Sequence, residues 1–163
     1  MNHSDCIRHW IIRNACGSDL AFLYATWSNS YHHDSLLAKS CKASVFGPYY
    51  DRVIDHILIQ PDTRVRIACN PSDPNVIWGY LVSQPKILHY TFVKEAFRKL
   101  KIGTDLFQDM GECLYFTHRT QFIEPILRKY SKITYNPFLL FRGEHNGKII
   151  ENTSKDNSSL RRT

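Results

Sequence analysis

The sequence predicts an α+β fold with a mixed, mostly antiparallel sheet. Its 163 residues, of which 43% are apolar and 22% charged, suit one globular domain with a substantial core. Stretches in which apolar residues alternate give way to stretches in which they recur every three or four residues, so strands and helices interleave along the chain. A strand that leads through a helix to the next strand normally pairs with it in parallel. The fourth and fifth strands are therefore expected to be parallel neighbours.

The first part of the chain predicts one strand and two helices. Residues 9–15 have a strand-like composition, and the Gly-Ser-Asp sequence at 17–19 supplies a stop and a helix cap. The apolar face of the first helix consists of Leu20, Leu23, Tyr24 and Trp27. Residues 28–42 are polar, and we expect them to be irregular. A second helical pattern covers 49–59 and ends at a Gln-Pro-Asp sequence.

The middle of the chain predicts three strands in an antiparallel meander. Two strand-like stretches, 64–69 and 76–83, are separated by a run of Asn, Pro, Ser and Asp at 70–75 that is typical of a turn. A third stretch, 86–93, follows directly after Gln84 and Pro85. Short connections of this kind join antiparallel neighbours.

The last part of the chain predicts helix, strand, helix and strand. Ile102, Leu106 and Met110 recur every four residues with polar residues between them, which indicates an amphipathic helix. A strand at 113–117, a short helix at 123–130 and a final strand region at 133–142 follow. Pro125 is tolerated only near the start of its helix.

The segment 90–107 carries the strongest functional signal. An apolar strand runs through a basic turn into a helix, and the first amides of a helix have no internal acceptor and carry partial positive charge. Arg98, Lys99 and Lys101 add formal charge beside those amides, and Gly103 removes a Cβ where a ligand would approach the backbone. This junction is suited to hold a phosphate.

The same segment resembles the cofactor motif of the Gcn5-related N-acetyltransferases (GNAT), a strand and a turn followed by Arg/Gln-x-x-Gly-x-Gly/Ala. Val93, Arg98, Ile102 and Gly103 match it, and Lys101 replaces the first glycine. Gly79 resembles the glycine that the family's third strand often carries. The resemblance extends with falling specificity over residues 8–142. It implies an α/β/α architecture of about six to seven strands, helices on both faces, and strands four and five that splay apart.

The resemblance also implies how acetyl-coenzyme A would bind. The backbone near two strand residues would pair with the pantetheine arm, and the amides of the turn would bind the pyrophosphate. These positions are Phe92, Val93, Arg98, Lys99, Leu100, Lys101, Ile102, Gly103 and Thr104. The Lys101 side chain could crowd the phosphates or pair with them.

Three residues are candidates for proton transfer. The stretch 127–135 resembles a family pattern at a helix end whose tyrosine returns a proton to the departing thiolate, and Tyr130 aligns with it, although Thr134 stands where the pattern has glycine. Tyr130 could equally complete an apolar helix face. An attacking ammonium must first lose a proton, and the candidates to take it are His89, four residues before Val93 in the fourth strand, and His118, at the end of the fifth strand. Alternatives are Glu95 and Glu124, or a packed structural role for both histidines.

The acceptor side of the site is the least readable part. In the family, the loop between the first two helices helps to shape it, which implies Tyr31, His32, Tyr49 and Tyr50. No metal site is expected, because His32 and His33 have only Asp34 at ligand spacing and a solvated loop is favoured.

Charge and composition limit the remaining alternatives. The net charge of +6 fits an anionic cofactor and also nucleic acid, but no nucleic-acid-binding signature accompanies the scattered basic residues. No apolar run is long enough to span a bilayer, and five scattered cysteines indicate reduced thiols, so a cytoplasmic protein is expected. We expect one domain over 1–150 and a disordered polar tail over 151–163.

These observations favour an N-acetyltransferase that moves acetyl from acetyl-coenzyme A to a primary amine by direct attack in a ternary complex. Two alternatives stay open at this point: a member of the same fold that has lost catalysis and serves as an interaction protein, and a small basic protein that binds nucleic acid. The identity of the amine and the oligomeric state are not encoded in any pattern that we find.

Overall fold

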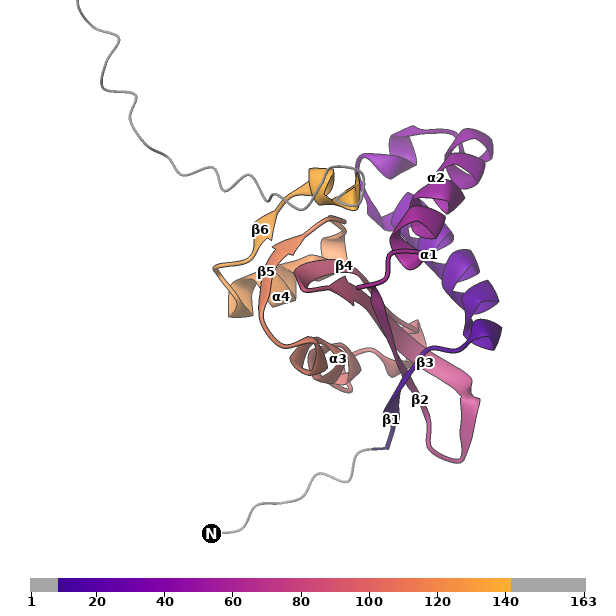
Figure 1. Ribbon diagram of the computed structural model, residues 1–163, viewed down its shortest axis with the longest axis vertical. Helices are drawn as coiled ribbons and strands as arrows, with labels where there is room; N and C mark the ends of the chain where they lie inside the picture. The colour runs from indigo at the N-terminus through magenta and orange to yellow at the C-terminus, as the bar shows by residue number, and fades with distance from the viewer. Residues whose placement is uncertain (1–8, 142–163) are drawn as a thin grey trace, which may run out of the picture.

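A computed structural model describes residues 9–141 and shows one six-stranded sheet. The strands are β1 (Ile11–Asn14), β2 (Arg64–Asn70), β3 (Asp73–Gln84), β4 (Lys86–Val93), β5 (Cys113–Phe116) and β6 (Thr134–Tyr135). They lie side by side in the order of the sequence (Figure 1). The expected tail at 151–163 and the expected domain end at residue 150 lie outside the described residues.

The pairing confirms the predicted mixed sheet. Strands β1 to β4 are antiparallel neighbours, and β4 pairs in parallel with β5. Strand β6 also pairs in parallel with β5, so the sheet has a second parallel pair. Each parallel step contains a helix, as a crossover connection requires.

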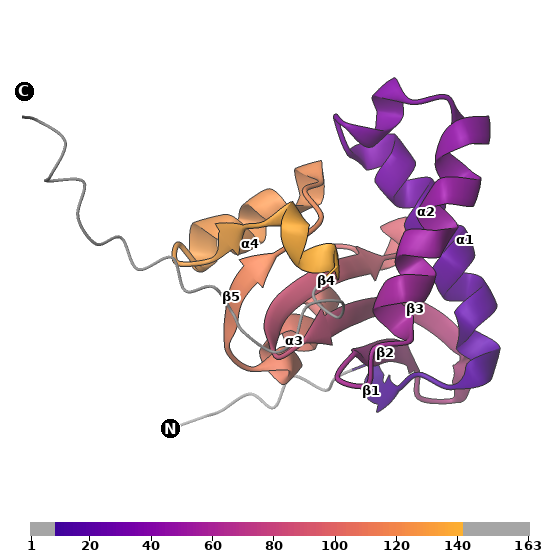
Figure 2. The same ribbon diagram turned by 45° about the horizontal axis from the view of Figure 1, so that its top comes forward.

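The helices cover both faces of the sheet. Helices α1 (Leu20–Asp34) and α2 (Ala43–Leu58) lie on one face, and α3 (Ile102–Met110) and α4 (Glu124–Lys129) lie on the other (Figures 1 and 2). The element order and the strand pairing agree with the acetyltransferase-like α+β fold that the sequence resemblance implies. The longest helices are too short or too polar to cross a membrane in the part of the chain that the structure describes.

Two apolar cores hold these layers together. On the α1/α2 face, fully buried Trp27, Ile54 and Ile57 pack against Ile67 and Tyr80 of the sheet. The other core, on the α3/α4 face, contains Ala68 and Leu81 from the sheet, Ile102 and Leu106 from α3, and Ile123. Burying a side chain of this size stabilises the fold by about 1.5–3 kcal/mol. Neighbouring sheet residues therefore face opposite cores, as strand alternation requires.

Gly79 allows β3 and β4 to approach closely. It pairs with Val93, and a Cβ at this position would lie 2.6 Å from the backbone oxygen of Phe92. No larger residue fits there without a shift of the backbone. The glycine that resembles the family's third strand is thus required by packing.

Two predicted helix boundaries were wrong. Helix α1 continues through part of the supposedly irregular segment 28–42 and ends at Asp34. The hydroxyls of Thr26 and Ser30 donate to the carbonyls of Phe22 and Thr26, so these polar side chains are satisfied within the helix. Helix α2 begins at Ala43 instead of residue 49, and it includes Pro48.

The predicted final strand region, 133–142, was also largely wrong. Only Thr134–Tyr135 pairs with β5, and a 3-10 helix covers Pro137–Phe141. Pro137 has no amide to donate to a sheet, so the strand ends before it. In contrast, Pro125 lies in the first turn of α4, as expected.

Candidate active site

Strands β4 and β5 separate halfway along β4. The two strands pair from Lys86 to Leu88, and the amide of Thr117 donates to the carbonyl of Leu88 at 3.1 Å. Beyond that point β4 continues to Val93 and pairs only with β3 within the described residues. The edge of β4 that faces β5 is thus free from His89 onward, where an extended ligand could pair with it.

The free edge leads into the turn before α3. Lys99 and Lys101 adopt left-handed backbone conformations, with φ of 68° and 69°. Both side chains are exposed. The amides of Ile102, Gly103 and Thr104 begin the helix and have no acceptor among the described residues. The turn therefore presents free amides and two cationic side chains together, which suits a phosphate group.

Lys101 adopts a backbone conformation that favours glycine. A left-handed residue is unfavourable for any side chain with a Cβ, so glycine is common at such positions. Lys101 keeps this conformation and directs its side chain to the surface. Lys101 thus occupies, with a side chain, a position that glycine would adopt more easily.

Arg98 ties the turn to the neighbouring loop. Its Nε donates to the carbonyl oxygen of Val93 at 3.1 Å, and its guanidinium lies 4.4 Å from the centre of the Phe122 ring. Phe122 belongs to the 3-10 helix Gln121–Ile123 that follows β5. The Arg98 side chain thus holds together the two segments that border the gap between β4 and β5.

A side chain at Gly103 would not clash with other atoms of the protein. A Cβ would lie 3.8 Å from Cγ2 of Val93, which is an ordinary contact. Packing within the described residues does not explain the glycine. Close approach of a ligand to the helix amides would explain it.

Both candidate histidines lie at the point where β4 and β5 separate. Nδ1 of His89 is 3.0 Å from Oγ1 of Thr117, and the same oxygen is 2.8 Å from Nδ1 of His118. Burial lowers the pKa of His89 to about 4. Burial and the adjacent His89 lower the pKa of His118 to about 3. Both imidazoles are therefore neutral at pH 7, and neither Nε2 has a hydrogen-bond partner among the described residues.

Four aromatic rings surround His118. Their centres lie 4.9–5.8 Å from the centre of the imidazole, and they belong to Tyr31, Trp27, Tyr90 and Tyr50. Burial raises the pKa of Tyr50 well above its usual value, so its hydroxyl stays protonated. This aromatic cage brings Tyr31 and Tyr50, both predicted for the acceptor side, next to His118.

A cavity of about 910 Å³ lies beside the cage. Its lining comes from the end of α1, the loop after it, the loop before α4, and β6. The residues are Tyr31, His32, His33, Asp34, Ser35, Leu36, Leu37, Lys39, Arg119, Thr120, Gln121, Glu124 and Tyr135. Tyr31 therefore lines the cavity and is also one of the four rings of the cage. Tyr49 does not line this cavity and is 67% exposed on α2.

Asp34 gives this cavity a carboxylate. Its Oδ1 accepts hydrogen bonds from Nε2 of Gln121 at 3.2 Å and from Nδ1 of His33 at 2.9 Å. No described residue donates to its Oδ2. The side chain is only 10% exposed, so the charge faces a low-dielectric region in which an ammonium would be attracted strongly. His32 is engaged elsewhere, since its Nε2 lies 2.9 Å from the carbonyl oxygen of Cys41.

Tyr130 lies on the other face of the sheet. It ends α4, and its ring packs 4.6 Å from that of Phe107 in α3. The side chain is half-buried, and its hydroxyl has no partner among the described residues. The structure thus gives Tyr130 a packing contact beside the motif helix, while its predicted role as an acid stays a prediction.

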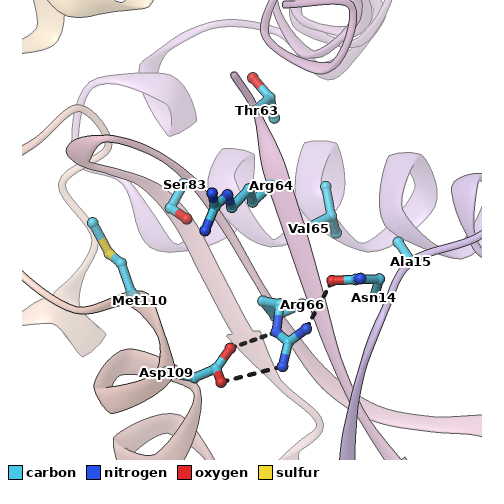
Figure 3. Close-up of a pocket in the computed structure, with 9 residues that line it drawn as sticks. All are labelled: Asn14, Ala15, Thr63, Arg64, Val65, Arg66, Ser83, Asp109 and Met110. Carbon is cyan, nitrogen blue, oxygen red and sulfur yellow. Dashed lines mark hydrogen bonds and ion pairs between the residues drawn. The ribbon is translucent and has the colours of Figure 1, made fainter. Parts of the chain in front are cut away.

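A second cavity, of about 620 Å³, lies at the far end of α3 (Figure 3). Arg66 dominates it. Its guanidinium donates to the side-chain oxygen of Asn14 at 2.7 Å and forms an ion pair with Asp109 (Figure 3). None of the predicted site residues lines this cavity. The charge of Arg66 is already neutralised by Asp109, so we assign the candidate active site to the cavity beside the cage.

Sequence reasoning missed several residues of the site. Thr117, Trp27 and Tyr90 were not predicted, although Thr117 directly precedes a candidate histidine. Asp34 was considered only as a metal ligand. Within residues 9–141, no three His, Cys, Asp or Glu side chains gather as metal ligands would.

Comparison with known proteins gives likeness at the level of structure only. No protein-family model matches the sequence, and no curated protein sequence matches it. A transcriptional regulator from Bacillus halodurans is similar over 87% of this chain and 99% of its own, with 20% identity and a TM-score of 0.49. An acetyltransferase from Vibrio fischeri is similar over 76% and 89%, with 16% identity and a TM-score of 0.39.

A third solved structure, an acetyltransferase of the GNAT family from Staphylococcus aureus, is similar over 62% of each chain, with 16% identity and a TM-score of 0.40. At these identities the solved structures assign no role to individual residues of this chain. The geometry of the chain itself must carry any argument about function.

Proposed function

We propose that this chain is an N-acetyltransferase that transfers acetyl from acetyl-coenzyme A to an amine. The observation that carries the proposal is the free edge of β4 from His89 to Val93, which is followed, after a 3-10 helix at Glu95–Phe97, by a turn with free amides. An extended amide-containing arm that ends in phosphates complements this arrangement. Pantetheine pyrophosphate is such an arm.

The residues of the turn would hold the phosphates. The amides of Ile102, Gly103 and Thr104 offer hydrogen bonds, and Lys99 and Lys101 offer charge. The thioester would then lie near the point where β4 and β5 separate. That point is also where His89, Thr117 and His118 meet.

The amine would enter from the cavity beside the cage. We propose that Asp34 attracts its ammonium form and that Tyr31 separates the cavity from the cage. The ammonium first gives one proton to solvent in the cavity, and the neutral amine then attacks the thioester carbonyl carbon. A second proton leaves the nitrogen, and the C–S bond breaks to release the thiolate. As the C–N bond forms, the nitrogen becomes acidic, so a weak base such as His118 is sufficient at that stage.

Ligand-dependent stability tests the first half of this proposal. Acetyl-coenzyme A at about 100 times its dissociation constant should stabilise the fold by about 2.7 kcal/mol, which thermal unfolding would detect. A single-stranded oligonucleotide at equal phosphate concentration serves as the control for charge alone. A shift with the oligonucleotide and none with acetyl-coenzyme A would favour a nucleic-acid-binding protein.

Turnover tests the second half. A panel of primary amines, assayed by release of free thiol, should contain acceptors, and Asp34→Asn should raise KM for the amine more than for acetyl-coenzyme A. Glu124→Gln is the matched control, because Glu124 lines the same cavity but is half-exposed beside Arg119. Cofactor binding without turnover on any amine would support a fold that has lost catalysis.

A further inference from the structure

One hydroxyl links the two buried histidines. Oγ1 of Thr117 lies 3.0 Å from Nδ1 of His89 and 2.8 Å from Nδ1 of His118. The three residues are 1%, 1% and 4% exposed, in the order His89, Thr117, His118. No other described residue has a side-chain hydrogen bond to the Thr117 hydroxyl. The three side chains therefore form one hydrogen-bonded chain with Thr117 in the middle.

The chemistry of the hydroxyl restricts the protons in this chain. A hydroxyl has one hydrogen, so Thr117 can donate to only one of the two imidazoles. If both rings donated to Thr117, its own hydrogen would be buried without an acceptor, at a cost of about 1–3 kcal/mol. Thr117 therefore donates to one Nδ1 and accepts from the other. Two neutral rings in this arrangement have opposite tautomers.

We propose that Thr117 is a positioning residue that holds His118 and His89 in opposite tautomers, with Nε2 of His118 as a bare proton acceptor. The catalytic part of this inference rests on the proposed function. His118 is assigned as the acceptor because its ring lies 4.9 Å from Tyr31, which lines the cavity. In this arrangement His118 is protonated at Nδ1 and His89 at Nε2.

The proton can then move through the chain in one direction. The amine proton passes to Nε2 of His118, and the Nδ1 proton of His118 passes to Oγ1 of Thr117. The hydroxyl proton of Thr117 passes to Nδ1 of His89. His118 and Thr117 end neutral, His89 carries the positive charge, and the electron pair of the broken C–S bond leaves with sulfur.

Nitrogen NMR of histidine-labelled protein tests the tautomers without any substrate. In the wild type we expect one ring protonated at Nδ1 and one at Nε2, assigned to His118 and His89 through single His→Gln variants. Thr117→Val, which replaces the hydroxyl with a methyl group of similar size, should abolish this pairing. Thr117→Ser should restore it. The same tautomer on both rings in the wild type would overturn the inference.

Kinetics tests the catalytic consequence. Thr117→Val should lower kcat by roughly 10- to 100-fold with little change in KM for acetyl-coenzyme A, and Thr117→Ser should recover most of kcat. Unchanged kcat in the valine variant, together with opposite tautomers in the wild type, would refute the positioning role. Complete absence of turnover in the wild type would instead refute the proposed function, while the wild-type spectrum would still decide the tautomers.

Discussion

Lys101 combines an unfavourable backbone conformation with a place in the proposed phosphate site. A residue with a Cβ in the left-handed region destabilises the fold by about 1–2 kcal/mol. Glycine removes this strain, but part of the stability gained is lost because glycine gives the unfolded chain more conformational freedom. Lys101→Gly should therefore raise the free energy of unfolding by about 0.5–1 kcal/mol. If the lysine pairs with phosphate, the same change should weaken acetyl-coenzyme A binding about two- to fivefold.

The chain offers a matched control for this prediction. Lys86 is also left-handed, with φ of 66°, but it lies at the opposite end of β4. Lys86→Gly also removes an exposed ion pair with Glu112, which contributes little, so it should give a similar gain in stability, measured by urea unfolding, with unchanged cofactor affinity. Equal affinities for both glycine variants would show that Lys101 does not contact the cofactor.

Gly103 leads to a second prediction at the residue scale. Because a Cβ fits beside Val93, Gly103→Ala should leave the fold intact and stabilise α3 by up to about 1 kcal/mol. Affinity for acetyl-coenzyme A should fall, because the methyl group would occupy space close to the helix amides. Calorimetric titration would measure the affinity. An undiminished affinity would show that the phosphates do not bind at this position.

At this scale the sequence predicted types of residue better than their partnerships. His89 and His118 were separate candidates, because the distance that makes Thr117 their common partner arises only when β4 and β5 pair. Tyr50 and Tyr49 were indistinguishable as acceptor residues. The spacing of Tyr50, Val53, Ile54 and Ile57 within the predicted helix 49–59 could have placed Tyr50 on the buried face, where the structure has it.

Among the elements, the contact between β3 and β4 is the least tolerant of change. The Cβ of Gly79→Ala would meet the backbone oxygen of Phe92, which no side-chain rotation can relieve. Overpacking of this kind destabilises by about 1–3 kcal/mol. Gly17→Ala is the control, since nothing lies within 4 Å of its Cβ position and the change should stay within about 0.5 kcal/mol. Chemical denaturation would compare the two, and equal stabilities would contradict this account of the glycine.

Element types were predictable because each carries its own period of apolar residues. Element ends were less predictable where polar side chains are satisfied locally. The hydroxyls of Thr26 and Ser30 made α1 look irregular although they bond within it, and Ser30 also lies 2.7 Å from the Tyr90 hydroxyl across the core. Strand β6 was overestimated because apolar residues at 138–141 belong to a 3-10 helix.

For the whole molecule, the two buried histidines make the fold sensitive to acid. In the unfolded chain each histidine has a pKa near 6.5. In the folded chain the pKa is about 4 for His89 and about 3 for His118. The unfolded state therefore binds more protons below pH 6.5, and stability falls as the pH falls. From pH 7 to pH 5 the loss should be roughly 2 kcal/mol for each histidine.

Urea unfolding at both pH values would measure this loss. His33→Gln should leave it unchanged, because His33 is exposed. A wild-type protein with equal stability at pH 7 and pH 5 would contradict the neutral, buried state of the pair. The Asp19 carboxyl, whose pKa is lowered to about 2 by its hydrogen bond with Arg13, adds to the loss only at lower pH.

The strictly sequential order of the sheet has a consequence for how the chain folds. Every strand pairs with the strand next to it in the sequence, but only β2, β3 and β4 are joined by short connections, because α1 and α2 lie between β1 and β2. Short closures such as those within β2 to β4 favour rapid folding. During synthesis, β1 to β4 can form their meander, with α1 and α2 packed on it, before α3 leaves the ribosome. The two parallel pairs then add one at a time, so the turn and α3 of the proposed cofactor site form only after the β4 edge is in place.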